Sequence, residues 1–436
     1  MSERNDIPYD SNRNTANSGG TQVIRAENNS TIENVTQISA DVLQIFANAP
    51  APLSTCIRIS EFGQLIEDRT RSFIGREFIF SAIDRHLGDR DFPSGYIVIR
   101  GEPGIGKTSL MAQLVKTRSY VHHFNIAAQN IRSTRDFLSN VNAQLIVKYQ
   151  LGYSGLPPQA TQDSGFLSKL VREASEKRAE DRVVVLVDAL DEAEDLGLAL
   201  DANRLYLPST LPPRVFFVVS TREQEDYKLV TDHRKDIYLR KDDPQNGADV
   251  RAYIQTYVGS NQPAMSNRIS QWGLDQPAFE KILTSKSEGN FMYLVHVLSD
   301  IRDGTLTKSN LDSIDDLPVG LRQYYQRHWR TMKARDCEEF ERVYQPVVCM
   351  LAVVREPVSQ AQIEEWTGLP STHVREVIKQ WRAFLTLTKS ASGERLYRIY
   401  HASFQDFLKD EVGLTRYHDK ISQTALDKIL GFRSAR

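Results

Sequence analysis

One stretch of the sequence, residues 96–115, constrains the fold more than any other. It opens with an apolar, mostly β-branched run at residues 96–99, which is typical of a buried strand. The next residues match the pattern G-x-x-x-x-G-K-[ST], and a helical segment begins at residue 109. A chance glycine-rich turn is the alternative, and the flanking strand and helix count against it. The stretch therefore predicts a phosphate-binding loop.

Each residue type in this loop suits a nucleoside triphosphate. Gly101, Gly104 and Gly106 let the backbone bend so that its N–H groups point at phosphate oxygens. The helix N-terminus adds a partial positive charge. Lys107 can reach the β- and γ-phosphates, and the Thr108 hydroxyl can bind Mg²⁺. The predicted nucleotide-binding residues of the loop are Gly101, Glu102, Pro103, Gly104, Ile105, Gly106, Lys107, Thr108 and Ser109.

A second, acidic motif follows an apolar strand predicted at residues 182–188. Asp188 ends this strand, at the edge where ligands bind in open α/β sheets, so it is predicted to hold Mg²⁺ directly or through water. Asp191 or Glu192 could orient or deprotonate the attacking water, and the sequence gives little basis for choosing between them. Arg222 follows another predicted strand and is placed to sense a γ-phosphate. A solvated acidic cluster and a salt-bridged surface arginine are the alternatives.

Length and composition limit the class of protein. At 436 residues the chain is too long for one core, so two to four domains are expected. The net charge of −2 gives no general attraction to nucleic acid or to an anionic membrane. Three cysteines without a C-x-x-C pair favour a reducing cytosol. There is no apolar signal region and no run of about 18–20 apolar residues, so we expect a cytoplasmic protein with no membrane partner.

The order of predicted elements suggests the domains. Strands alternate with helices up to about residue 240, which indicates an α/β, doubly wound, parallel-sheet P-loop NTPase domain. Only helices follow, until helices and a hairpin beyond residue 340 suggest a winged helix. We expect a mostly disordered tail at 1–50, a nucleotide-binding α/β domain with N-terminal helices at 51–240, an all-α helical domain at 241–335, a winged-helix domain at 336–410 and a C-terminal helical stretch at 411–436.

The predicted tail contains one less uniform segment, residues 20–38. Its β-branched residues partly alternate with asparagine and glutamine, a composition that favours stacked cross-β strands. The segment resembles the short amyloid-forming signalling motifs at the N-termini of some fungal and bacterial immune receptors. A plain flexible tail is the preferred alternative.

Seven segments, spread over roughly residues 70–410, together resemble the NACHT group of STAND NTPases. These are the regulated ATPases of NOD-like immune receptors, fungal incompatibility proteins and bacterial antiphage proteins. The strongest marks are the apolar strand ending in D-small-x-D-E and the pattern His-x-Ser-Phe-x-x-Phe-Leu. The segments are FIGRE (73–77), GEPGIGKTS (101–109), VVVLVDALDE (183–192), VVSTR (218–222), EGNFMYL (288–294), LPVGL (317–321) and YHASFQDFL (400–408).

The resemblance implies further site residues and the cofactors ATP or ADP with Mg²⁺. His401 takes the place of the winged-helix histidine that contacts the β-phosphate of ADP and locks the closed state. Without the resemblance, a histidine beside apolar residues would more often belong to the core. Phe73, Ile74 and Arg76 would lie at the adenine and ribose side. The chain departs from some relatives at residues 289–291, which lack the proline used against adenine.

The resemblance also implies a function. ADP would hold the protein closed, and exchange for ATP would allow self-association into a ring or filament in innate-immune, antiphage or programmed-cell-death-type signalling. Slow ATP hydrolysis would reset the switch, and residues 20–38 could engage a separate effector protein.

Two alternatives belong to other classes. An AAA-like motor would need pore-loop aromatic residues and an arginine finger acting in trans, which we cannot assign. A nucleotide-controlled DNA-binding regulator would use the winged helix. Residues 371–382 carry three basic residues and one glutamate, and the net charge is slightly negative, so nucleic acid is the disfavoured partner.

Overall fold

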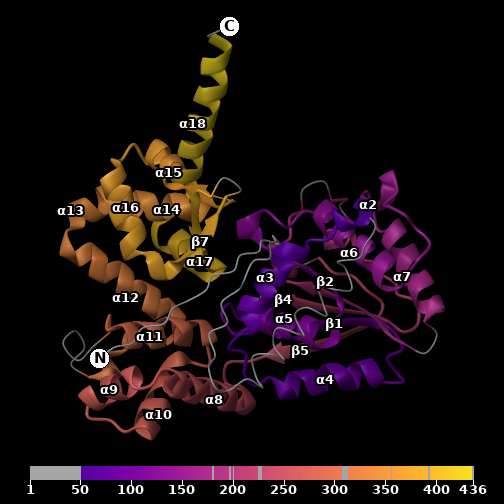
Figure 1. The fold of residues 1–436 in the computed structure, drawn as a ribbon, viewed down its shortest axis with the longest axis horizontal. Helices are drawn as coiled ribbons and strands as arrows, with labels where there is room; N and C mark the ends of the chain where they lie inside the picture. Colours follow the sequence, from indigo (N-terminus) through magenta and orange to yellow (C-terminus); the bar gives the residue numbers. More distant parts are fainter. Residues whose placement is uncertain are drawn as a thin grey trace, which may run out of the picture.

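The computed structural model describes residues 51–434 except 179–180, 196–197, 200, 224–227, 307–312, 355 and 391–392. The predicted tail at residues 1–50, with the segment at 20–38, lies outside the described residues. Figure 1 shows an α/β part, coloured indigo to magenta, beside a mainly helical part coloured red to yellow.

The α/β part is built on a five-stranded sheet in the order β2-β3-β4-β1-β5, with every pair of neighbours parallel. Its strands are β1 (Gly95–Gly101), β2 (Val121–Phe124), β3 (Val183–Asp188), β4 (Val215–Thr221) and β5 (Arg234–Leu239). Four of them, β1 to β4, are almost wholly buried. For β1, β3 and β4 this agrees with their continuous apolar runs, which are typical of strands covered on both faces. The predicted parallel-sheet P-loop NTPase fold is confirmed.

Helices cover both faces of this sheet (Figure 1). Tyr96 and Val98 of β1 pack into one hydrophobic core and Ile97 and Ile99 into another, because successive strand side chains point to opposite faces. The first core includes α2 (Ala51–Ser54), α6 (Thr134–Lys148) and α7 (Gly165–Lys177), and the second includes α3 (Ile59–Thr70), α4 (Glu77–Gly88) and α5 (Lys107–Arg118). Short 3₁₀ turns in this part are η1 (Ala127–Gln129), η2 (Pro158–Thr161), η3 (Leu190–Glu192) and η4 (Arg204–Tyr206).

A helical region follows β5, as predicted. It consists of α8 (Pro244–Ser260), α9 (Ala264–Gln271), α10 (Gln276–Ser287), α11 (Phe291–Asp303), the 3₁₀ turn η5 (Ile314–Asp316) and α12 (Gly320–Arg335). The sequence pattern did not predict α9, which is short and contributes only Met265 and Ile269 to the core.

The C-terminal part combines helices with a small antiparallel sheet in the order β6-β8-β7. The predicted hairpin corresponds to β7 and β8, and the two-residue β6 was not predicted. The first helix of this part is short and runs through a π turn into the next helix. The elements are α13 (Cys337–Glu339), the π turn η6 (Phe340–Tyr344), α14 (Gln345–Val353), β6 (Val358–Ser359), α15 (Gln360–Thr367), α16 (Ser371–Gln380), η7 (Arg382–Phe384), β7 (Leu385–Lys389), β8 (Arg395–Ile399), α17 (Ala402–Val412) and α18 (Thr415–Ser434).

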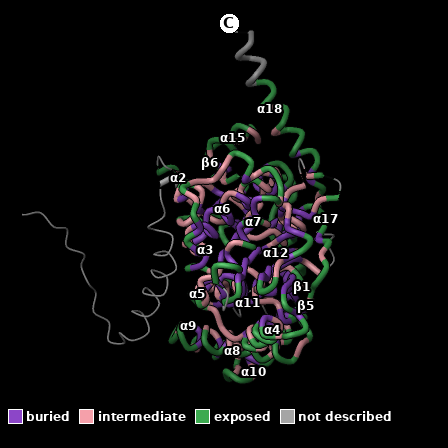
Figure 2. The backbone as a smooth tube through the Cα atoms, turned by 90° about the vertical axis from the view of Figure 1, so that its right-hand side faces the viewer, coloured by how far each residue is buried: buried purple, intermediate pink, exposed green. Residues whose placement is uncertain are grey.

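The helical region and the C-terminal part share one hydrophobic core, from Val250 to Tyr417. Tyr325 of α12 packs on Phe384 and Phe404, with ring centroids 5.7 and 5.0 Å away. The core is therefore continuous across residue 335, where two domains were expected to meet. Beyond it, α18 projects from the body with mostly exposed residues (Figure 2). Within the described part of the chain, every helix is too short or too polar to cross a membrane.

The segment before α4 makes a tight approach to α8. Gly75 and Arg76 both have positive φ, +74° and +69°, so the chain turns sharply just before the helix. A Cβ atom on Gly75 would lie 2.1 Å from Oδ1 of Asp249 in α8. Only glycine fits this position without moving Asp249, whose Oδ2 accepts a hydrogen bond from the Arg76 backbone N–H at 2.9 Å.

Gly75→Ala is expected to destabilise the protein by about 2 kcal/mol, from the left-handed backbone and the clash together. The midpoint of denaturant unfolding measures this change. Gly88→Ala is the matched control, because a Cβ at Gly88 would meet no atom within 4 Å. We expect its midpoint to be unchanged or slightly raised. Equal midpoints for the two variants would contradict the steric argument.

Candidate functional site

The predicted phosphate-binding loop connects β1 to α5 at the carboxyl edge of the sheet. Gly104 and Gly106 have φ of +82° and +102°, values that favour glycine. The Lys107 ammonium donates to the Gly101 and Glu102 carbonyls at 2.6 and 3.1 Å, which holds it over the loop. Burial lowers the pKa of Lys107, and the nearby Asp191 opposes this shift. The loop thus presents a desolvated cation and a helix N-terminus to the same space.

Asp188 lies at the end of β3, 1% exposed, and faces the start of α5. Its carboxylate accepts hydrogen bonds from the Ser220 and Thr108 hydroxyls, and burial raises its pKa against both. Mg²⁺ prefers hard oxygen ligands, and a carboxylate beside a hydroxyl at the phosphate end of a P-loop supplies them. Thr108 and Asp188 therefore fit the predicted metal site.

The structure distinguishes the two carboxylates that the sequence could not rank. Asp191 is held by Arg222, whose Nε lies 3.0 Å from Oδ2 and whose backbone N–H donates to Oδ1 at 3.2 Å. Glu192 accepts one hydrogen bond, 3.0 Å long, from the Ala127 backbone N–H. Burial, with help from Asp191 and Asp188, raises the pKa of Glu192 to about 7. A carboxyl group with that pKa suits proton transfer, so the geometry favours Glu192 over Asp191.

Arg222 reaches beyond the α/β part. Its Nη1 lies 2.9 Å from Oδ2 of Asp406 in α17 while Nε pairs with Asp191. The arginine predicted to sense a γ-phosphate is therefore an ion-pair bridge between the phosphate site and the C-terminal part.

His401, the N-cap residue of α17, lines a cavity together with Lys107 and Arg222. Its Nδ1 accepts hydrogen bonds from the Ser403 backbone N–H at 3.2 Å and from the Ser403 hydroxyl at 2.7 Å. Burial and neighbouring cations, including Arg69 and Lys107, lower the pKa of His401 to about 3. In the neutral ring, accepting at Nδ1 places the proton on Nε2, so Nε2–H is available as a donor. The cavity, ≈ 130 Å³ in volume, joins α17 to the P-loop.

A second cavity of ≈ 250 Å³ continues from the phosphate site. Phe73, Ile74 and Arg76 line it, on the side where a base and sugar were expected. The aromatic residues Tyr253, Phe291 and Tyr400 complete its wall. Its apolar and aromatic lining suits a flat heterocycle.

Among the residues that line this cavity, Arg76 also has a structural role. It is 2% exposed and donates from Nη1 to Asn246 Oδ1 at 2.7 Å and from Nη2 to the Ile105 carbonyl at 2.6 Å. Its guanidinium also lies 4.8 Å from the Phe291 ring centroid. Burial lowers the pKa of Arg76 to about 10, and Asp249 opposes this. The contacts tie the P-loop to α8 and α11.

The segment that lacks the adenine-side proline docks directly on the P-loop. Asn290 caps α11 and donates from Nδ2 to the Pro103 carbonyl at 2.9 Å. The Met292 N–H donates to the Gly104 carbonyl at 3.1 Å. A Cβ on Gly104 would lie 2.7 Å from Asn290 Oδ1, which explains the glycine there. The helical region is thus seated on the loop by Asn290 in place of a proline.

Comparison with known proteins agrees with this geometry. An AAA domain family model matches residues 90–221, the segment from just before β1 to the end of β4. NACHT domain- and WD repeat-containing protein 1 from Mus musculus is 27% identical over 169 residues, which are 35% of this chain and 10% of that protein. The protein of the same name from Homo sapiens is 28% identical over 165 residues, 34% of this chain and 10% of that protein. The chain carries a NACHT/STAND-type P-loop NTPase. It spans about a tenth of the length of these relatives.

Two solved structures are similar over most of the chain. A STAND protein with a tetratricopeptide repeat sensor from Pyrococcus horikoshii gives a TM-score of 0.40 at 14% identity, covering 82% of this chain and 45% of that one. A structure of Drosophila ORC bound to DNA gives 0.30 at 13% identity, covering 81% of this chain and 98% of that one. At TM-scores this low, neither similarity bears on the function of the NACHT/STAND-type NTPase.

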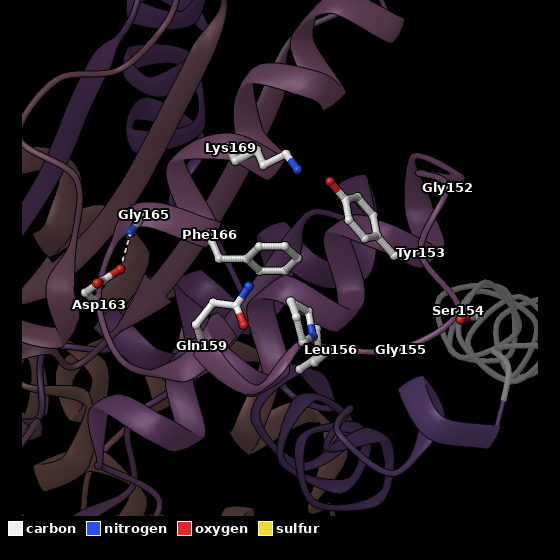
Figure 3. Close-up of a pocket in the computed structure, with 11 residues that line it drawn as sticks. Gly152, Tyr153, Ser154, Gly155, Leu156, Gln159, Asp163, Gly165, Phe166 and Lys169 are labelled. Atoms are coloured by element: carbon white, nitrogen blue, oxygen red, sulfur yellow. Dashed lines mark hydrogen bonds between the residues drawn. The ribbon is translucent and has the colours of Figure 1, made fainter.

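The NACHT/STAND-type NTPase has a larger hollow elsewhere, of ≈ 750 Å³, beside α7 (Figure 3). Tyr153, Phe166 and Lys169 point into it, and Lys169 lies 5.4 Å from the Tyr153 ring centroid. None of the predicted nucleotide residues lines this hollow. Predicted nucleotide residues such as Lys107, His401 and Phe73 line instead the two cavities next to the P-loop, called the P-loop cavities below.

Sequence reasoning missed several residues that line the P-loop cavities, notably Arg69, Tyr253, Phe291 and Tyr400. Phe291 and Tyr400 lie inside segments that resemble the family, so a signal was present. Arg69 lies in α3, before those segments, and donates to the Tyr400 hydroxyl at 2.9 Å. Only the folded chain brings Arg69 to these cavities.

Proposed function

We propose that this chain is an ADP/ATP-controlled switch with slow ATPase activity. The proposal rests on one observation. The cavity of ≈ 130 Å³ at the P-loop, here called the phosphate cavity, is lined by His401 at the N-cap of α17. Asp406 of α17 also forms an ion pair with Arg222, which lines the same cavity. The C-terminal part is thus bonded to groups that would touch phosphate. A nucleotide that changes those contacts shifts the balance between closed and open forms, by as much as its affinities for the two differ.

The binding mode follows from the charges. The loop from Gly101 to Ser109 would hold the α- and β-phosphates, with Lys107 on the β- and γ-phosphates. Thr108 and Asp188 would hold Mg²⁺, which would supply positive charge against the phosphates. His401 Nε2–H would donate to the β-phosphate of ADP. The base would enter the aromatic cavity beside Phe73 and Ile74.

The hydrolytic step would use Glu192. Its carboxylate would accept a proton from the attacking water while Lys107 and Arg222 offset charge on the phosphates. Turnover would be slow, because product ADP is held by groups on both parts of the protein.

The wider assignment extends the proposal. The domains would be the α/β unit at 51–240, a helical domain at 241–335, a winged helix at 336–410 and the helical stretch at 411–436. Released from α17, the nucleotide domains would assemble into a ring or filament in cytoplasmic innate-immune, antiphage or cell-death-type signalling. Residues 20–38 would pass the signal to a separate effector.

The bound nucleotide tests the switch. The purified chain is denatured and the released nucleotide identified, while light scattering follows its mass before and after addition of ATP and Mg²⁺. ADP on a monomer that assembles with ATP supports the proposal. An empty site with fast turnover and no change in mass indicates a motor ATPase, and salt-dependent binding of duplex DNA indicates a DNA-binding regulator.

His401→Ser is expected to speed ADP release by roughly tenfold, the effect of losing one hydrogen bond to a charged group. Serine retains an N-cap oxygen for α17, so the helix itself should persist. Displacement of a fluorescent ADP analogue measures the release rate. His418→Ser, at an exposed position of α18, is the control and should not change it. An unchanged release rate in His401→Ser would remove His401 from the nucleotide site.

A further inference from the structure

A third cavity adjoins the phosphate cavity on the side of Asp188 and Glu192. It has a volume of ≈ 550 Å³ and shares Arg69, Thr108, Glu192 and His401 with the phosphate cavity. Its far wall consists of α3 and of the strands β7 and β8. The γ end of a nucleoside triphosphate on a P-loop points toward the metal-binding hydroxyl and carboxylate. This cavity therefore begins where the γ-phosphate of bound ATP would lie.

Arg398 of β8 lines this cavity together with Glu192. With its side-chain amide turned so that the oxygen faces Arg398, Gln129 accepts hydrogen bonds from both Nη atoms at 3.0 Å. The Nε atom is shielded from solvent and has no hydrogen-bond partner among the described residues. Burial lowers the pKa of Arg398, and the carboxylate of Glu192 opposes the shift. Among the described residues, this partly desolvated guanidinium is held by a neutral amide and forms no ion pair with an anionic side chain, the partner that such groups usually have.

The surrounding charges indicate which anion it would meet. Glu192, across the cavity, accepts its hydrogen bond from the Ala127 backbone and is partly buried. Asp188 faces Thr108 and Ser220. Neither carboxylate is hydrogen-bonded to Arg398 among the described contacts. All three residues line the cavity of ≈ 550 Å³, which leaves room for a further group. The anion that the proposed function brings to this space is the γ-phosphate.

We propose that Arg398 contacts the γ-phosphate of bound ATP, so that the C-terminal part completes the hydrolytic site of its own chain. The inference rests on the proposed function. The water oxygen forms a bond to the γ-phosphorus while the bond from that phosphorus to the β–γ bridging oxygen breaks. One water proton passes to Glu192, and the bridging oxygen leaves with its electron pair as part of ADP. Arg398 donates to the γ-phosphoryl oxygens as their charge redistributes.

This places hydrolysis in one conformation. Because β8 belongs to the same part as α17, Arg398 and His401 reach the nucleotide together. ATP would be hydrolysed when the C-terminal part docks, and the ADP formed would then be held by His401. An open molecule would lack Arg398 and keep its ATP.

The test compares Arg398→Gln with Arg395→Gln in the full chain. Arg395 lies on the same strand and is exposed, so it is a matched control. Three quantities are measured: single-turnover hydrolysis of ATP with Mg²⁺, affinity for ADP and affinity for a non-hydrolysable ATP analogue. Arg398→Gln is expected to slow hydrolysis at least about tenfold, since arginines on a γ-phosphate contribute that much or more. Its ADP affinity and the behaviour of Arg395→Gln should match the unchanged protein.

A purely structural role for Arg398 would give different results. Equal weakening of ADP and of the ATP analogue would mean that Arg398 only supports the fold, and it would overturn the inference. A faster or unaltered hydrolysis rate would overturn it as well. Partial recovery of Arg398→Ala by free guanidinium ion would support direct contact. If the protein without any substitution bound neither ADP nor the ATP analogue, the proposed function itself would be refuted. Failure of the inference can therefore be told apart from failure of the proposed function.

Discussion

Glu192→Gln is expected to slow ATP hydrolysis by roughly 10²-fold or more, the usual contribution of a general base. Glutamine keeps the size of the side chain and an oxygen for the Ala127 N–H but cannot accept a proton from water. ADP binding should persist, because the groups on the β-phosphate are unchanged. Single-turnover hydrolysis and ADP affinity, measured on the same preparation, check both statements.

The pH profile makes this prediction specific to ionisation. Burial raises the pKa of Glu192 to about 7, so the basic form is mostly absent at pH 6 and present at pH 8. The rate should therefore rise with pH through about 7 in the unchanged protein and lose this step in Glu192→Gln. The control is Glu194→Gln. The Glu194 carboxylate pairs with Arg132, away from the proposed proton transfer, so this variant should keep the rise of the hydrolysis rate with pH. The same step in Glu192→Gln would assign the ionisation to another group.

Arg76→Ala should destabilise the protein by about 3 kcal/mol, because removal of one partner from a buried polar network leaves the others unpaired. The groups left behind are the Asn246 amide, the Ile105 carbonyl and the Asp249 carboxylate. These groups also fix the P-loop against α8, so nucleotide affinity should fall together with stability. Denaturant unfolding and ADP binding measure the two effects.

Arg71→Ala is the control for Arg76→Ala. Arg71 lies five residues earlier in the chain, is 69% exposed and pairs with Asp68 at 3.4 Å. Surface pairs of this kind contribute about 0–1 kcal/mol. Comparable losses from the two variants would show that burial of Arg76 is unimportant.

The sequence predicted the α/β fold because its strands are long apolar runs and its glycine loop has a fixed pattern. β1, β3 and β4 could be predicted for that reason, whereas the two-residue β6 exists only through its pairing with β8. α9 was missed because most of its residues are polar. The boundary between the helical region and the C-terminal part was less clear, since one core runs through both.

The site was partly predictable for a related reason. The P-loop, Asp188 and Arg222 follow local patterns, and the structure places them at two adjoining cavities that are both lined by His401. The choice between Asp191 and Glu192 needed the partner of each carboxylate, which depends on β4 and η1. Arg69 and Arg398 reach the cavities from elements distant in the chain, so no local pattern could place them.

The contacts that join the α/β part to the rest of the chain differ in how strongly salt would weaken them. The α/β part holds the helical region through Arg76, which is 2% exposed. It holds α17 through Arg222 and Asp406, whose side chains are 20% and 48% exposed. Dissolved ions screen exposed pairs far more than buried ones, with a screening length of about 8 Å at physiological ionic strength. Raising the ionic strength should therefore weaken the contact between the α/β part and α17 before the contact through Arg76.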